Sequence, residues 1–215
     1  VTVALPIQFQ RQVWTLALAL EGLALVGLFR KLPHPGLRDA GVYLLVAAFV
    51  RLTLNPAVLE YTRSGVVLWN WYLYTYGTAT VCLFLAARWL GTSEAKSLSM
   101  PARSLLNTLG TILAFVLVNI EIADAFSTGT RLTFELSGSF ARGLSFTVAW
   151  ALFAFGLLVV GLRWAIAPSR YAGLALMGVT LLKLLLVDTA RLDQVYRIVA
   201  RSEERRVGKE CLRLC

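Results

Sequence analysis

Two ionisable residues inside apolar segments are the first candidates for chemistry. Glu21 lies near the middle of the apolar segment QVWTLALALEGLALVGLF, and Arg51 lies in the apolar segment that follows it. At about 1.5 Å per helical residue, Glu21 is about 12 Å from either end of its segment, too far for a glutamate side chain to reach water. The sequence therefore predicts that Glu21 has a partner, a water-filled cavity or a proton.

Arg51 is the natural partner for Glu21. Counted from the basic residues that end the first segment and open the second, the two side chains differ in depth by about 6 Å in an antiparallel hairpin. An arginine side chain can bridge that difference. Two interpretations stay open: a buried polar site for a substrate, an ion or a proton, and a structural ion pair that fixes helix register.

A second polar group lies in later segments. Glu121 and Asp124 are three residues apart, so they share a helix face on which two carboxylates can bind a cation or share a proton. An acidic helix end at the membrane surface is the alternative. Asn70, between Trp69 and Trp71 in VVLWNWYLYTYG, is either a contact for a carbohydrate or lipid headgroup or part of an interfacial aromatic belt.

Familiar catalytic patterns are missing from the sequence. His34 is the only histidine, so histidine-based metal clusters and Ser-His-Asp triads are excluded within this chain. Neither G-x-G-x-x-G nor a phosphate-binding loop occurs. We expect no metal and no cofactor, and the sequence identifies no catalytic residue that would favour an enzyme.

The composition indicates a membrane protein. Of the 215 residues, 58% are hydrophobic and 15% are charged, with a mean hydropathy of +0.69; soluble domains are about 45–50% apolar and about 25% charged. The net charge of +9 does not indicate nucleic-acid binding, because the basic residues stand at the ends of apolar runs and form no face or block.

Six apolar runs have the length of membrane spans, and backbone hydrogen bonding in lipid makes them helices. The predicted fold is therefore an all-α, polytopic transmembrane helical bundle within residues 1–200. Lys183 lies close enough to the end of the sixth run for its side chain to extend to the interface. The spans are expected at about 12–29, 40–59, 66–90, 105–126, 144–166 and 171–187, with a truncated seventh from Leu192 and a kink or early end at Asn55-Pro56.

Charge asymmetry predicts the orientation. The linkers after the first, third and fifth spans hold eight basic residues against five on the other side, and the acidic residues show the reverse bias. Because cytoplasmic loops are enriched in Lys and Arg, we expect these linkers in the cytoplasm and the N-terminus outside.

The last fifteen residues, 201–215, look foreign to the rest of the chain. Arg201–Cys211, RSEERRVGKEC, looks like the in-frame translation of a sequencing-library adaptor, and a charged cytoplasmic tail is the alternative. Without this tail Cys82 is the only cysteine, which leaves no disulfide or cysteine metal site within the chain.

Several segments carry a family resemblance, most specifically NWYLYTYG and KLLLVD with YRI after it. Together with VWTLALALEGLALVGLF, LTLNPAV and GLLVVGLR, they resemble the bacterial family of predicted membrane proteins known as domain of unknown function 2339. The resemblance implies a multi-pass protein of the bacterial inner membrane and a longer parent chain. The expected partners are then the lipid bilayer and the missing helices. It implies no activity.

The functional expectation combines these observations. We expect an integral membrane protein for transport or for lipid or glycan handling, with its buried polar site around Glu21 and Arg51. The alternative is a non-catalytic membrane scaffold or assembly partner.

Overall fold

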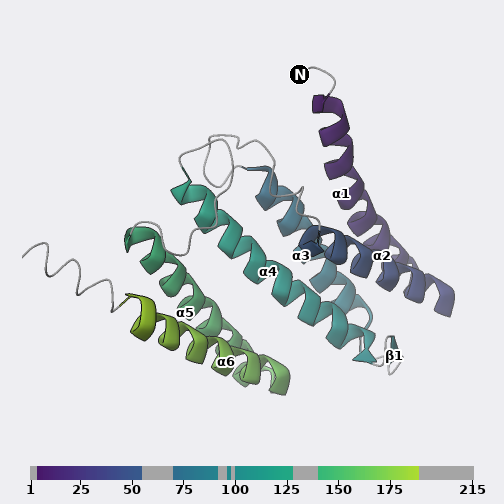
Figure 1. Cartoon of the computed structure of the whole chain (residues 1–215). Helices are drawn as coiled ribbons and strands as arrows, with labels where there is room; N and C mark the ends of the chain where they lie inside the picture. Colours follow the sequence, from purple (N-terminus) through teal and green to yellow (C-terminus); the bar gives the residue numbers. More distant parts are fainter. Residues whose placement is uncertain (1–3, 55–69, 92–95, 98–99, 128–139, 189–215) are drawn as a thin grey trace, which may run out of the picture. The chain divides into compact units, whose positions relative to one another are not determined.

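The computed structural model of the chain describes residues 4–54, 70–91, 96–97, 100–127 and 140–188. These residues form helices almost throughout (Figure 1). The chain divides into two compact units, Val1–Phe134 and Glu135–Cys215, which are described separately. The predicted all-α class is confirmed.

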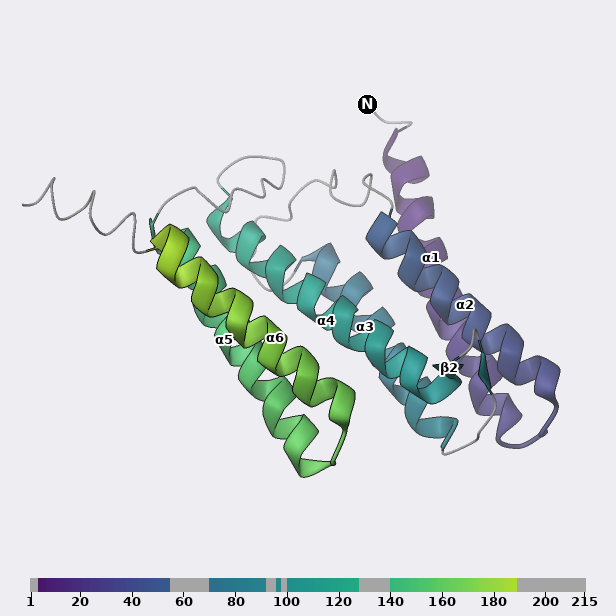
Figure 2. The ribbon, with the colours of Figure 1, turned by 60° about the horizontal axis from the view of Figure 1, so that its bottom comes forward.

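The described residues of unit 1 form four helices. They are α1 (Ala4–Phe29), α2 (Pro35–Leu54), α3 (Trp71–Trp89) and α4 (Ala102–Phe126). The linker before α4 holds a two-residue antiparallel ladder of β1 (Lys96–Ser97) and β2 (Met100–Pro101), in a segment predicted only to be a linker. Figure 2 shows α1 beside α2 and α3 beside α4, so helices that follow each other in the sequence pair in space.

Glycines set the crossing of α1 and α2. A Cβ on Gly22 would lie 2.9 Å from Leu45 Cγ and 3.0 Å from the carbonyl oxygen of Gly41. A Cβ on Gly41 would lie 2.8 Å from Val26 Cγ2. The two backbones therefore touch at a point that no larger side chain can occupy, as in helix pairs packed through small residues in membranes.

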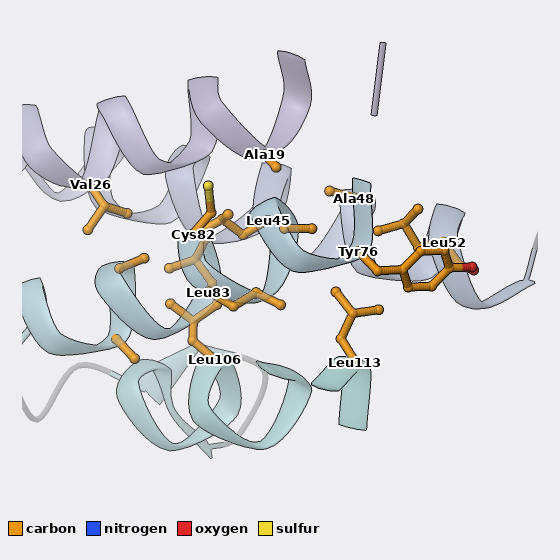
Figure 3. Packing of buried hydrophobic residues seen from close by; sticks show 14 of the residues in the cluster. Ala19, Val26, Leu45, Ala48, Leu52, Tyr76, Cys82, Leu83, Leu106 and Leu113 are labelled. Carbon is orange, nitrogen blue, oxygen red and sulfur yellow. The ribbon is translucent and has the colours of Figure 1, made fainter. Parts of the chain in front are cut away.

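The core of unit 1 draws side chains from all four helices. Figure 3 shows them pointing toward one another, and Tyr76 and Leu83 of α3 are each 1% exposed. The Tyr76 hydroxyl donates a hydrogen bond of 2.8 Å to the carbonyl of Leu52, near the described end of α2. The α-helical donor to this carbonyl would be the N–H of residue 56, which is a proline and has none, so Tyr76 satisfies the carbonyl and fixes α3 against α2.

The contacts between α3 and α4 keep one antiparallel register. A Cβ on Gly77 would lie 4.0 Å from Leu117 Cδ2, and a Cβ on Gly110 would lie 3.1 Å from Phe84 Cε1. A step of seven residues along α3, from Gly77 to Phe84, thus corresponds to seven residues back along α4. Extended by another seven residues, this register places the first turn of α3 beside the last turns of α4.

Unit 2 is a helical hairpin of α5 (Phe140–Arg163) and α6 (Ala167–Lys183), and a π-helical turn, Leu184–Asp188, continues α6. The tight connection includes Ala165 at φ 53° and a hydrogen bond from the N–H of Ile166 to the carbonyl of Gly161. This is the Schellman geometry, which favours glycine at the position that Ala165 occupies. Gly161 is required for space, since a Cβ there would lie 2.7 Å from Arg170 Cγ.

The expected number of spans is corrected by the structure. Among the described residues, three helices rather than six are long and apolar enough to cross a membrane: Ala102–Phe126, Ala141–Arg163 and Ala167–Leu186. Trp14–Phe29 is apolar but shorter. In α2, every 18-residue stretch contains Arg38, Asp39 and Arg51, while tyrosine and threonine lower the hydropathy of the first half of α3.

The helix positions otherwise follow the predicted runs, and the largest difference is at the start of α1, which begins at Ala4 rather than at about residue 12. The expected kink at Asn55-Pro56, the truncated seventh span and the foreign tail at 201–215 lie outside the described residues.

Candidate functional site

Asn70 begins the site because it begins a helix. Its backbone is extended, and its Oδ1 accepts a hydrogen bond of 2.8 Å from the N–H of Leu73. Asparagine is among the best N-cap residues because it satisfies one of the unpaired N–H groups of the first turn. The cap uses only the oxygen of the amide, so the Nδ2 group stays available for a second contact.

That second contact reaches two carboxylates on α4. Asn70 Nδ2 lies 3.2 Å from Glu121 Oε2 and 3.2 Å from Asp124 Oδ2 and donates to both. Asn70 is 2% exposed and Asp124 is 4% exposed, whereas Glu121 is half-buried. The amide therefore bridges two acidic side chains with most of the arrangement removed from solvent. We call these three residues the acidic cluster.

The acidic cluster has an unsatisfied atom. Glu121 Oε1 is buried, and among the described residues it accepts no hydrogen bond. A buried carboxylate oxygen without a donor is costly, and a proton or a bound cation removes that cost. Among the described residues, no group of three or more His, Cys, Asp or Glu side chains comes together as a metal site.

The sequence predicted part of this cluster. It placed Glu121 and Asp124 on one helix face and identified Asn70 separately, within the aromatic run. The structure brings the three together across 51 and 54 residues of sequence. Trp71, the first residue of α3, is half-buried, and Trp69 lies outside the described residues.

Glu21 and Arg51 are placed differently. Glu21 is exposed on α1, one residue from the Gly22 crossing, and Arg51 is half-buried in the last described turn of α2. No ion pair joins the two residues in the described part of the chain; the ion pair found there is Arg38 with Asp39, at 2.8 Å. A site around Glu21 and Arg51 stays a prediction.

Unit 2 has a polar contact that sequence reasoning missed. Lys183 Nζ donates to the carbonyl oxygen of Gly143, at 2.9 Å, and to the hydroxyl of Thr147, so the ammonium turns toward α5. Thr147 Oγ1 also donates to the Gly143 carbonyl, at 3.1 Å. From the sequence, the Lys183 side chain was expected to extend to the membrane interface. The only available signal was that Lys183 and Thr147 stand at similar distances from the turn between their helices.

The chain matches the model of the family described as predicted membrane protein (DUF2339) over residues 36–200, about three quarters of its length. No significant match was found among curated proteins or among solved structures. The match and the apolar helices agree on location in a membrane. The chain belongs to the DUF2339 family of predicted membrane proteins.

Proposed function

We propose that this chain is part of a multi-pass transport protein of the bacterial inner membrane and that the acidic cluster is its cation- or proton-binding site. The observation that carries the proposal is the Asn70 amide held between Glu121 and Asp124, at 3.2 Å from each. Ionisable side chains within membrane segments are costly, and they are concentrated in ion pathways and proton relays.

The chemistry of the cluster favours a positive ligand. Two carboxylates face one neutral amide, and Glu121 Oε1 accepts no hydrogen bond from the described residues. Carboxylate and amide oxygens are the ligands that hard cations prefer, and paired carboxylates also share protons. Because Asn70 Oδ1 is used in the helix cap, the two carboxylates supply the charge and Asn70 holds them in place.

The distribution of charge supports the expected orientation. The cluster lies at the Asn70 end of α3, while basic residues gather at the opposite helix ends of unit 1. An excess of basic residues marks the cytoplasmic side, so the acidic cluster faces outward and meets cations entering from outside. These basic residues are Arg30, Lys31, Arg38, Arg88 and Arg103.

The test is a flux measurement on the full chain. The purified protein is reconstituted in liposomes that contain a pH-sensitive dye, and proton flux is recorded after imposing a pH gradient, with and without Na⁺ or K⁺. We expect the double variant Glu121→Gln/Asp124→Asn to abolish the flux. Glu21→Gln is the matched control, since it neutralises another carboxylate of the same unit.

Each outcome of this test decides between sites. Wild-type flux that the double variant leaves unchanged would exclude the acidic cluster as the pathway. If Glu21→Gln alone abolished flux, the site would instead be the predicted one around Glu21 and Arg51. Lipid or glycan handling stays a prediction, because Trp69 of the aromatic run lies outside the described residues.

A non-catalytic scaffold or assembly partner is the second candidate function, and the exposed position of Glu21 favours it. A carboxylate in the middle of an apolar helix needs a donor, and a helix of another protein can supply one on this face. This function predicts no flux in liposomes and a constant co-purifying partner that Glu21→Gln releases.

A further inference from the structure

A hollow lies at the end of unit 1 where α1 and α3 finish. Its volume is about 340 Å³, and it is lined by Gly27, Arg30, Lys31 and Trp89. It stands at the opposite end of α3 from the acidic cluster and is independent of the function proposed for that cluster. We call it the basic hollow.

Gly27 and Trp89 shape the wall of the basic hollow. Gly27 has no side chain, and a Cβ there would lie 3.0 Å from Trp89 Cζ3. The indole ring therefore lies directly across the last turn of α1 and is half-buried. Tryptophan at the end of an apolar helix is typical of the headgroup level of a bilayer.

Arg30 and Lys31 supply two positive charges that the described structure does not use. Both are exposed, and neither has an ion-pair or side-chain hydrogen-bond partner among the described residues. They are not needed to cap α1 either. The carbonyls of Gly27 and Leu28 accept hydrogen bonds from the backbone N–H groups of the residues that follow, Arg30 and Lys31 among them.

We propose that the basic hollow binds the headgroup phosphate of an anionic phospholipid. Arg30 and Lys31 contact the phosphate oxygens, and the Trp89 ring packs against the glycerol and the first carbons of the acyl chains. Basic pockets beside membrane helices bind anionic headgroups in this way. The apolar wall of the hollow distinguishes this ligand from free phosphate, which presents no apolar surface to Trp89.

The helix dipoles do not reverse this preference. Both α1 and α3 end here, and each helix C-terminus carries about half a negative charge. The two full charges of Arg30 and Lys31 exceed the sum of these partial charges. Arg88, which is exposed in the last turn of α3, is a third basic residue and directly precedes Trp89 of the hollow in the sequence.

Lipid binding is tested on the full chain in detergent by native mass spectrometry with equimolar dioleoylphosphatidylglycerol and dioleoylphosphatidylcholine. We expect the wild type to retain phosphatidylglycerol in preference to phosphatidylcholine. Arg30→Gln/Lys31→Gln should weaken phosphatidylglycerol binding about 30-fold, which corresponds to about 2 kcal/mol for two interfacial basic residues. Gly27→Leu should weaken it by filling the hollow without changing the charge.

The matched control is Arg103→Gln/Arg163→Gln, which also removes two exposed basic residues at helix ends. Arg163 precedes an exposed tryptophan, Trp164, and neither residue lines the basic hollow. Equal losses in the two double variants would overturn the proposal in favour of a general charge effect. Unchanged phosphatidylglycerol binding by Arg30→Gln/Lys31→Gln in protein of wild-type helicity would also overturn it.

A competition arm separates the lipid from free phosphate. Inorganic phosphate and glycerol 3-phosphate are added to the wild type at increasing concentration in buffers of equal ionic strength. We expect the bound phosphatidylglycerol to stay on the protein. Displacement at concentrations comparable to that of the lipid would assign the hollow to a soluble phosphate compound instead.

Discussion

Replacing Asn70 separates its two roles, because each uses a different atom of the amide. Oδ1 caps α3 and Nδ2 donates to Glu121 and Asp124. Asn70→Ala removes both. Loss of an N-cap costs about 1 kcal/mol, and loss of donors to charged acceptors costs about 1.5–3 kcal/mol. We expect Asn70→Ala to lower the free energy of unfolding by about 3 kcal/mol.

Two further variants divide this loss. Asn70→Ser keeps a capping oxygen and loses only the donor, so about 2 kcal/mol of the loss should remain. Asn70→Asp also keeps the cap but places a third carboxylate beside Glu121 and Asp124. Like charges about 4 Å apart repel by up to about 4 kcal/mol at an effective dielectric constant near 20, a limit that proton uptake lowers. We therefore expect Asn70→Asp to be the least stable of the three.

A double variant tests the geometry directly. Glu121→Gln combined with Asn70→Asp exchanges donor and acceptor across the 3.2 Å contact, so the pair should recover at least about 1 kcal/mol relative to the sum of the single variants. Stability is measured by SDS titration in mixed micelles, with helix content followed by circular dichroism. A stability of Asn70→Ala within about 0.5 kcal/mol of wild type would refute these two roles of the amide. So would an Asn70→Asp variant that is at least as stable as Asn70→Ser.

Two predictions concern unit 2. Lys183→Met should lower the free energy of unfolding by about 1 kcal/mol in the same titration, because it removes the hydrogen bonds to Gly143 and Thr147. Such contacts contribute about 0.6–1.7 kcal/mol in membranes. A variant more stable than wild type would show that the cost of burying the charge exceeds their contribution. Ala165→Gly should stabilise the protein by about 1 kcal/mol, because φ 53° is costly for alanine and free for glycine, and an unchanged melting temperature would contradict this.

The sequence predicted the helices because their apolar runs are continuous and their turns contain proline or glycine. It predicted six spans, whereas three of the described helices are long and apolar enough to cross a membrane, since an apolar run can form a helix without being hydrophobic enough to span a bilayer. Arg38, Asp39 and Arg51 do not prevent α2 from forming, but they place three charges in 20 residues. Helix formation depends on local hydrogen bonding, whereas insertion depends on the summed transfer cost of every side chain.

The acidic cluster could be predicted from the sequence better than the contacts of Glu21 and Arg51. Whether two side chains meet depends on the rotation of each helix about its axis as well as on their depth along it. Asn70 meets Asp124 by the same seven-residue steps that pair Gly77 with Leu117, so counting outward from the turn between α3 and α4 could have found the contact. The same counting placed Glu21 near Arg51 and ignored rotation. Gly22 occupies the crossing with α2, and its neighbour Glu21 points about 100° away from it. Because Gly22 occupies the crossing with α2, the Glu21 carboxylate lies on a different face of α1.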